Sequence, residues 1–207
     1  MSNFKTPQEK FWAEEFGNDY IERNQGEQLL ASNLNFFTKA LAKADRINSC
    51  KEFGANIGMN LKALTLLYPG AKLEGIEINQ RASHELSKLI GEDNVFNCSI
   101  FDAPSIEKVE LSLIKGVLIH INPDMLQTVY QKLYDSSSKY ILIAEYYNPS
   151  PVAIQYRGHS DKLFKRDFAG EFLDKFGDTK LVDYGFAYRR DIAFPQDDIT
   201  WFLIKKI

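Results

Sequence analysis

The sequence predicts an α/β fold with a doubly wound, mostly parallel sheet of seven strands, preceded by a helical amino-terminal segment. Strand-like and helix-like stretches alternate from residue 47 onward, which is typical of parallel strands joined by helical crossovers. The stretch 111–121 is apolar almost throughout, as expected for a central strand buried on both faces. The stretches 179–191 and 198–207 resemble two strands joined by a loop. They predict an antiparallel strand at one edge of the sheet.

Each remaining element has a local signal. Apolar residues recur at helical spacing from Leu30 to Leu41 and predict an amphipathic helix over 26–44. Asn122 followed by Pro123 is a typical helix start, with a cap and then a proline at the first helical position. The other predicted strands are 47–54, 71–78, 94–100 and 139–147, and the other predicted helices are 58–70, 79–91 and 122–138.

Composition and charge restrict the partners of the chain. Its 207 residues are 44% hydrophobic, which suits one domain over 1–207, with a helical lid over 1–45 and a Rossmann-like core over 46–207. The net charge of −3 provides no positive field for nucleic acid or an anionic membrane, and no apolar run approaches the length of a membrane span. We therefore expect a small-molecule partner, no nucleic acid and no membrane, and a monomer or homodimer.

The amino terminus and the cysteines predict a cytoplasmic protein. The first residues are polar and acidic, whereas a signal peptide begins basic and then becomes apolar. Cys50 and Cys98 are far apart in apolar surroundings, which suits free thiols in a reducing compartment. Two cysteines without CxxC spacing and three scattered histidines predict no metal site.

The loop after the first predicted strand contains Gly54 and Gly58, with Asn56 between them. In a doubly wound sheet, ligands bind beyond the carboxyl ends of the strands, where glycine allows a positive φ and a close backbone approach. Glu77 ends the second predicted strand, where an acid can accept hydrogen bonds from both ribose hydroxyls of an adenosine. Alone, such a loop is more often a turn and such an acid is usually solvated; together they favour an adenosine-type cofactor.

The residues around this loop distinguish between cofactors. A pyrophosphate favours a third glycine and an open helix start, but Met59 and Asn60 occupy that region. Glu52 precedes the loop, where it would repel a pyrophosphate and attract the ammonium group of an amino acid. S-adenosylmethionine has an amino-acid end, an adenosine end and no phosphate, so the sequence favours it over NAD.

Several stretches resemble the class I S-adenosylmethionine-dependent methyltransferases. They are EFGANIGMN, GIEIN, NCSIFDAP and LIKGVLIHINPDML, with Asn56 in place of the second glycine of that family's loop. The chain resembles most closely the pseudaminic acid biosynthesis-associated methylases, through TPQEKFWAEEFGNDYIERN, KGVLIHINP, AEYYNPSPVAIQYRG and DDITWFLIKK. This resemblance implies methylation of a small polar molecule, such as an amino sugar or a sugar nucleotide.

A cofactor site follows from these motifs. The resemblance implies that Ser99 hydrogen-bonds the adenine while Ile100 and Phe101 pack against its faces. Tyr20 and Arg23, on an amino-terminal aromatic stripe that is otherwise a packing face, can close over the cofactor and meet its carboxylate. The full predicted set is Tyr20, Arg23, Glu52, Gly54, Asn56, Gly58, Glu77, Ile78, Ser99, Ile100, Phe101, Lys115 and Gly116.

The acceptor side is predicted from residues that follow the fourth and fifth strands. His120 and Tyr146 are candidate bases for a hydroxyl acceptor, although a buried histidine that holds its loop is an equally ordinary role. An amine that arrives neutral needs no base, so the sequence leaves N- and O-methylation open. The predicted acceptor-binding residues are Trp12, Glu145, Tyr147, Tyr156 and Arg157.

Three alternatives to a small-molecule methyltransferase can be weighed on the sequence. An NAD-dependent oxidoreductase would need a third glycine and a hydride-transfer set, and the only Tyr-x-x-x-Lys, from Tyr68 to Lys72, is interrupted by Pro69-Gly70. A non-catalytic binding module of the same fold would normally lose the cofactor loop, which is intact here. A nucleic-acid methyltransferase is disfavoured by the acidic balance of the chain.

Overall fold

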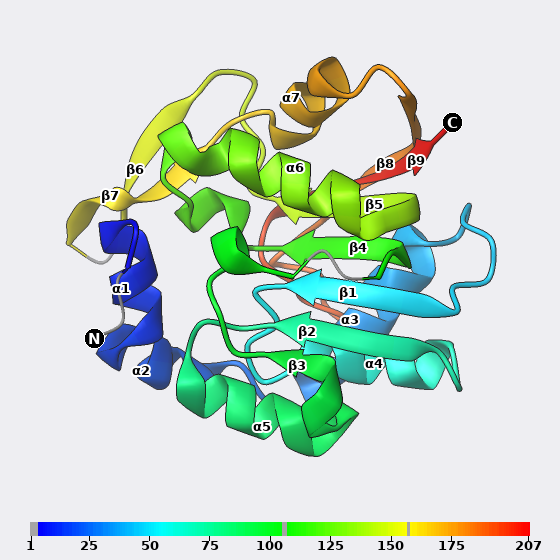
Figure 1. Cartoon of the computed structure of the whole chain (residues 1–207), viewed down its shortest axis with the longest axis horizontal. Helices are drawn as coiled ribbons and strands as arrows, with labels where there is room; N and C mark the ends of the chain where they lie inside the picture. Colours follow the sequence, from blue (N-terminus) through cyan, green and yellow to red (C-terminus); the bar gives the residue numbers. More distant parts are fainter. Residues whose placement is uncertain (1–3, 105–106, 157) are drawn as a thin grey trace.

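The computed structural model describes residues 4–104, 107–156 and 158–207. Its main sheet has seven strands in the order β3-β2-β1-β4-β5-β9-β8, as Figure 1 shows. The strands β1 to β5 are parallel, which confirms the predicted doubly wound sheet. The bounds are Ser49–Phe53 for β1, Lys72–Ile76 for β2, Val95–Phe96 for β3, Val109–Lys115 for β4, Ser137–Glu145 for β5, Thr179–Ala187 for β8 and Ile199–Lys206 for β9.

The predicted closing strand pair lies at one edge of the sheet, with the antiparallel strand as its inner member. β9 lies between β5 and β8 and is antiparallel to both, and β8 forms the edge itself. The chain reaches the edge first and then returns beside β5. β9 is therefore paired on both sides, and its alternate residues Trp201 and Leu203 are buried in the core.

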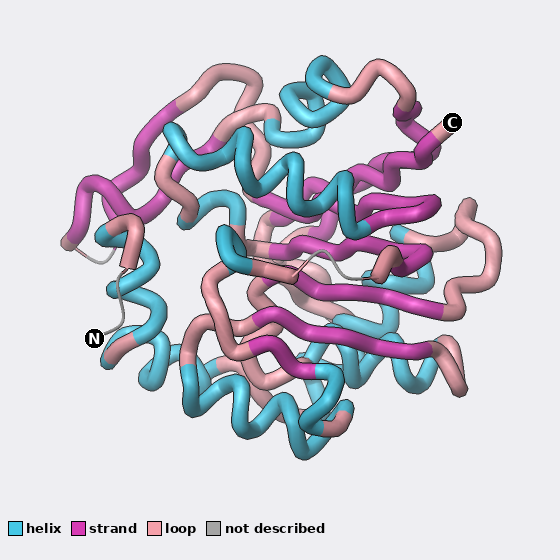
Figure 2. The backbone as a smooth tube through the Cα atoms, viewed as in Figure 1, coloured by secondary structure: helices cyan, strands magenta, loops and turns pink. Residues whose placement is uncertain are grey.

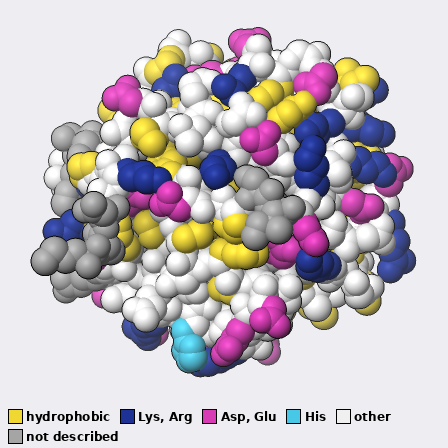
Figure 3. Space-filling model, viewed as in Figure 1, with side chains coloured by type: hydrophobic (Ala, Val, Ile, Leu, Met, Phe, Trp, Pro, Cys, Tyr) yellow, Lys and Arg dark blue, Asp and Glu magenta, His cyan; other side chains and the backbone are white. Residues whose placement is uncertain are grey.

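Helices cover both faces of this sheet. α3 (Glu27–Ala40), α4 (Met59–Leu67) and α5 (Gln80–Ile90) pack on one face, and α6 (Leu126–Ser136) and α7 (Phe168–Lys175) pack on the other. Successive side chains of a strand point to opposite faces, so Cys50 joins the first core while Phe53 joins the second. Figure 3 shows charges of both signs interspersed over one face of the molecule.

The fourth strand ends earlier than the sequence predicted. β4 stops at Lys115, and Gly116 then adopts a φ of 68°, which only glycine adopts readily. A short 3₁₀ helix, Leu118–His120, follows in place of the predicted continuous strand. The apolar run therefore fills the core in two conformations, and the change of direction brings His120 over the end of the sheet.

The amino-terminal segment forms two short helices, α1 (Pro7–Ala13) and α2 (Glu15–Arg23), which meet at Glu14. Their aromatic side chains pack together across this break. The Trp12 ring centroid lies 5.1 Å from that of Phe16 and 5.2 Å from that of Tyr20. Both helices lie beyond the carboxyl ends of β1 and β2 (Figure 1).

A two-stranded antiparallel hairpin, β6 (Val152–Tyr156) and β7 (His159–Lys165), was not predicted. Its sequence signal is the alternation of Val152, Ile154 and Tyr156 before Gly158, whose φ is 88°. Figure 2 shows this hairpin beside the amino-terminal helices, and the Phe16 and Tyr156 ring centroids are 6.0 Å apart. In the described ranges, no helix is both long and apolar enough to cross a membrane.

Candidate active site

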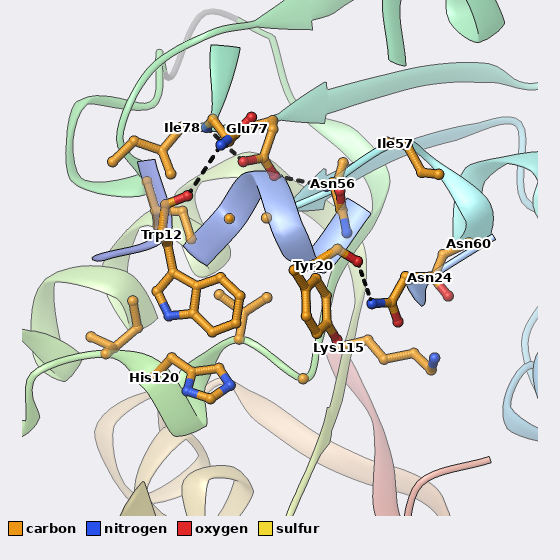
Figure 4. Close-up of a pocket in the computed structure, with 18 of the residues that line it drawn as sticks. Trp12, Tyr20, Asn24, Asn56, Ile57, Asn60, Glu77, Ile78, Lys115 and His120 are labelled. Carbon is orange, nitrogen blue, oxygen red and sulfur yellow. Dashed lines mark hydrogen bonds between the residues drawn. The ribbon is translucent and has the colours of Figure 1, made fainter. Parts of the chain in front are cut away.

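A pocket lies beyond the carboxyl ends of β1, β2 and β4, beneath α1 and α2 (Figure 4). It brings together twelve of the residues that the sequence predicted for cofactor, acceptor or catalysis. They are Trp12, Tyr20, Gly54, Asn56, Glu77, Ile78, Ser99, Ile100, Phe101, Lys115, Gly116 and His120. Their individual roles remain predictions, but their shared location is a feature of the structure.

Asn56 keeps the backbone conformation that a glycine would otherwise supply. Its φ is 49°, in the left-handed region that asparagine tolerates better than most other non-glycine residues. In this conformation its backbone N–H donates to Oε2 of Glu77 over 2.7 Å, a bond drawn in Figure 4. The departure from the usual glycine is therefore compatible with the loop.

The two glycines of this loop serve protein packing. A Cβ on Gly54 would lie 2.7 Å from a methyl group of Val117, and one on Gly58 would lie 2.6 Å from a methyl group of Leu86. Both residues also have a positive φ. Gly54 lines the pocket, whereas Gly58 is absent from the pocket lining and lets the start of α4 approach α5. From the sequence, both glycines were predicted to leave room for a ligand.

Glu77 directly follows β2, and a backbone N–H group donates to each of its two carboxylate oxygens. Its Oε1 accepts from the N–H of Asn79 and its Oε2 from the N–H of Asn56, each over 2.7 Å. Burial raises the pKa of this carboxyl group, and backbone hydrogen bonds from Asn79, Asn56 and Ile78 oppose that shift. A carboxylate has about four lone-pair sites, so Glu77 can still accept a hydrogen bond from a ligand in the pocket.

The segment after β3 provides a mixed polar and apolar wall. The Ser99 hydroxyl oxygen accepts from the N–H of Phe101 over 3.2 Å, which leaves the hydroxyl hydrogen able to donate to a ligand. Ile78, Ile100 and Phe101 line the same pocket. This arrangement suits a flat heterocycle with polar edges.

A polar corner lies at the other side of the cofactor loop. Asn60 donates to Oε1 of Glu52 over 2.6 Å. Glu52 is 1% exposed and does not line the pocket, but Asn60 and Lys115 do. Burial raises the pKa of Glu52 to about 8, while Asn60 and the charge of Lys115 oppose the shift. Within the described part of the chain, neither Oε2 of Glu52 nor Oδ1 of Asn60 has a hydrogen-bond partner.

His120 faces the pocket from the 3₁₀ helix after β4. Its ring lies below that of Trp12, with centroids 4.6 Å apart (Figure 4). The ring nitrogen Nδ1 lies 2.6 Å from the backbone oxygen of Lys162 in β7. Burial lowers the pKa of His120 to about 4, so the ring is neutral near pH 7.

Glu145 has a different place from the one predicted. It is 3% exposed, and its carboxylate accepts from the N–H groups of Val117 and Leu118 over 2.9 and 2.8 Å, and of Ile119 over 3.4 Å. These are the otherwise unpaired donors at the start of the 3₁₀ helix that carries His120. Glu145 therefore holds this turn and is absent from the pocket lining, contrary to the predicted acceptor contact.

The tyrosines after β5 also lie away from the pocket lining. Tyr146 hydrogen-bonds with Asp197, and burial and that negative charge both raise its pKa. A phenol accepts a proton only when ionised, so this environment opposes the predicted role of Tyr146 as a base. Tyr147 is 42% exposed and packs near Phe202 on the surface.

The remaining predicted residues flank the site or lie outside the described parts. Tyr156 in β6 is not among the pocket-lining residues, but its ring centroid is 5.3 Å from that of His120. Arg157 lies outside the described residues. The backbone of Arg23 ends α2, but its side chain is outside what the structure describes.

Sequence reasoning did not assign several carboxamide side chains to the site. Asn24, Asn33, Asn60 and Asn79 all line the pocket. Asn79 was predicted only as a helix cap, and it does cap α5 through Ala82. Asn24 and Asn33 lie in the amino-terminal helical region, so only the tertiary fold brings them to the sheet.

Comparison with known proteins identifies the class of fold. No family model matches the chain, and no curated protein matches its sequence significantly. Magnesium protoporphyrin IX methyltransferase from Synechocystis, with bound S-adenosylhomocysteine, has a TM-score of 0.70 and 13% identity, over 96% of this chain and 97% of that one. The Burkholderia thailandensis 1,6-didemethyltoxoflavin-N1-methyltransferase has a TM-score of 0.68 and 14% identity, over 100% and 92% of the two chains. The chain therefore has the fold of the S-adenosylmethionine-dependent methyltransferases.

Proposed function

We propose that this protein is an S-adenosylmethionine-dependent methyltransferase that acts on a small polar molecule. The observation that carries the proposal is one pocket with three matched parts. Glu77 faces the space where a ribose would lie, Ser99 to Phe101 form the wall for a heterocycle, and Asn60 and Lys115 form the polar corner. The structural neighbours support the same interpretation, since several of them hold S-adenosylmethionine or S-adenosylhomocysteine.

The polar corner favours an amino-acid end over a pyrophosphate. Oδ1 of Asn60 is a buried acceptor without a partner among the described residues, and an ammonium group is a donor of the right kind. Glu52 stands directly behind Asn60 and holds its amide through a 2.6 Å hydrogen bond. Lys115 can meet the carboxylate of the same ligand. A pyrophosphate would instead lie beside the carboxyl group of Glu77, with the acid Glu52 buried behind Asn60.

S-adenosylmethionine, when bound, supplies a methyl group on a positively charged sulfur. The residues of this chain then have to orient the two reactants and exclude water, because such a displacement is accelerated mainly by alignment. A Cβ on Gly116 would have no atom of the described residues within 4 Å, so the backbone there leaves open space beside the pocket. The aromatic rings of Trp12 and Tyr20 also line the pocket (Figure 4).

The acceptor is proposed from the resemblance to the pseudaminic acid biosynthesis-associated methylases. That resemblance favours an amino sugar or a sugar nucleotide. The pocket continues past the cofactor loop to His120 and Trp12, which supports an acceptor bound beside these two rings.

Two measurements test the proposed function. Isothermal titration should show binding of S-adenosylhomocysteine and none of NAD; tight NAD binding without S-adenosylhomocysteine binding would make the protein an oxidoreductase candidate. Incubation with labelled S-adenosylmethionine and a panel of amino sugars and sugar nucleotides should then transfer label to at least one of them. Cofactor binding with no transfer to any acceptor class would instead support a non-catalytic binding module.

A further inference from the structure

The ring of His120 is held from two directions by parts of the chain distant in sequence. Glu145, at the end of β5, accepts hydrogen bonds from the N–H groups of the turn that carries the histidine. The backbone oxygen of Lys162, in the β6–β7 hairpin, lies 2.6 Å from Nδ1 of the ring. Glu145 and Lys162 lie 25 and 42 residues from His120 along the chain (145 − 120 and 162 − 120). The Glu145 contacts hold the backbone of the turn, whereas the Lys162 contact fixes the ring itself.

The contact with Lys162 determines which ring nitrogen carries the hydrogen. A backbone oxygen can only accept, so Nδ1 must be the donor and must be protonated. The neutral ring then has a bare lone pair on Nε2. In Figure 4 the ring lies beneath Trp12 at the pocket, with its far edge directed toward the side where Tyr20 lies. The pocket is therefore given a fixed hydrogen-bond acceptor at this point.

The surroundings of the ring keep it in that form. Trp12 and Tyr156 pack around it with ring centroids at 4.6 and 5.3 Å. Among the described residues, no carboxylate contributes to the shift of its pKa, which burial lowers and the contact with the Lys162 oxygen raises. His120 is thus a neutral ring at pH 7, with hydrogen on Nδ1, and its Nε2 can accept a hydrogen bond without first losing a proton.

We propose that the group this protein methylates is a hydroxyl, which donates its hydrogen to Nε2 of His120, and that Glu145 is a positioning residue for that ring. The proposal rests on the proposed methyltransferase function. In the transfer, the hydroxyl oxygen forms a bond to the methyl carbon while the bond from that carbon to sulfur breaks. The electron pair of the broken bond stays on sulfur, and the hydroxyl proton moves to Nε2 of His120. The ring later returns this proton to solvent.

A hydroxyl fits this site better than an amine. A neutral amine attacks through its own lone pair and can release its proton after the transfer, so it needs no base in the pocket. A hydroxyl is a poor nucleophile until its proton is accepted, and Nε2 is the kind of group that accepts it. The histidine is a weak base, which further favours the more acidic hydroxyls among possible acceptors.

The first test examines the ring without any acceptor. Nitrogen-15 spectra of histidine-labelled protein, saturated with S-adenosylhomocysteine, should show one neutral ring with hydrogen on Nδ1 and none on Nε2 at pH 7. The chain has three histidines, and the His120→Asn variant assigns the signal. A ring with hydrogen on both nitrogens, or a neutral ring with its hydrogen on Nε2, would overturn the proposal whether or not an acceptor is known.

The second test separates the two ring nitrogens by substitution. The amide of His120→Asn can still donate to the Lys162 oxygen but lacks an acceptor at Nε2, whereas His120→Gln can present an amide oxygen near the Nε2 position. Turnover should fall about 10²–10⁴-fold in the asparagine variant, the usual contribution of a base, and less in the glutamine variant. His84→Asn, an exposed change on α5, is the matched control. Equal turnover in His120→Asn and the wild type would refute the assignment.

The third test locates the transferred group. Trideuteriomethyl S-adenosylmethionine is incubated with amino sugars that carry both hydroxyl and amino groups, and the products are mapped by mass spectrometry and NMR. Label on oxygen supports the proposal. Label on nitrogen overturns it but leaves the proposed methyltransferase function intact, whereas failure to bind S-adenosylhomocysteine would remove that function itself.

Discussion

The two ends of the pocket are built from different kinds of structure. At the proposed cofactor end, Glu77, Asn56 and Ser99 follow three parallel strands, and the Glu77 carboxylate accepts from backbone N–H groups of its own loop and of the loop after the neighbouring strand β1. At the acceptor end, Trp12 and His120 come from a helix and a 3₁₀ turn far apart in sequence. The first end therefore forms wherever these adjacent parallel strands pair, which the strand pattern predicts, whereas the second exists only after the lid, the hairpin and the sheet have packed together.

Substitution of Glu145 by alanine should have the largest effect, and it should act on the acceptor end alone. Three N–H groups of the turn would lose their acceptor, so the free energy of unfolding should fall by at least about 3 kcal/mol, at 1–3 kcal/mol for each unpaired buried group. Turnover should fall as His120 loses its fixed position, while affinity for S-adenosylhomocysteine changes less than about threefold. Urea denaturation and titration calorimetry measure the two quantities.

The glutamine variant provides the control for this prediction. Glu145→Gln keeps one oxygen for the close donors Val117 and Leu118 and loses only the longer contact to Ile119. Its stability should lie between those of the wild type and the alanine variant. An alanine variant with wild-type turnover would show that the position of His120 does not depend on Glu145.

Substitution of Glu77 by alanine should weaken cofactor binding and leave acceptor binding nearly unchanged, the reverse of the Glu145 substitution. Affinity for S-adenosylhomocysteine should fall by about 1–3 kcal/mol, the cost of a lost charged hydrogen-bonding partner. The Michaelis constant for the acceptor should change little, because Glu77 lies at the other end of the pocket. Glu92→Ala removes the same charge from an exposed position and is the control. Unchanged affinity in the Glu77 variant would show that this acid does not contact the cofactor.

The difference between the two ends of the pocket explains which features could be predicted from the sequence. The alternation of strands and helices predicted the sheet, and the residues at strand ends predicted most of the cofactor end. The role of Glu145 was missed because the sequence shows an acid at a strand end but not that its carboxylate accepts from backbone N–H groups of the turn after β4, 28 residues away for Val117 (145 − 117). The early end of β4 was missed because apolar residues are needed in both a strand and a buried turn. The contact from Lys162 to His120 is made by a backbone oxygen, which leaves no trace in side-chain identity.

Asn79 connects the two ends, and its loss should weaken both modestly. Its side-chain oxygen caps α5, and its amide nitrogen donates to the backbone oxygens of Trp12 and Ala13 and to the side-chain oxygen of Asn18 over 3.0–3.4 Å. Asn79→Ala should reduce stability by about 1 kcal/mol, the usual value of a lost cap. It should also increase hydrogen exchange in α1 and α2. Unaltered exchange there would show that the lid is held by its aromatic contacts alone.

A further prediction concerns Glu52 and the pH dependence of stability. The pKa of this buried group is about 8 in the folded protein, against an ordinary value of 4.5. Between these values the folded state binds more protons than the unfolded state, so stability falls as pH rises from 5 to 8. Glutamine cannot ionise, so Glu52→Gln should lose less stability over this range. The difference should be at least about 1 kcal/mol, roughly one pKa unit.

The same measurement with ligand decides whether Glu52 belongs to the cofactor end. Other titrating groups, including Glu145 with a pKa of about 7 and His120 with a pKa of about 4, are common to both proteins and cancel in the comparison. An ammonium group bound at Asn60 would stabilise the ionised form of Glu52 and so lower its pKa. Saturating S-adenosylhomocysteine should therefore flatten the pH dependence of wild-type stability toward that of the variant. Ligand-saturated curves that stay as far apart as the free ones would place the ammonium elsewhere in the pocket.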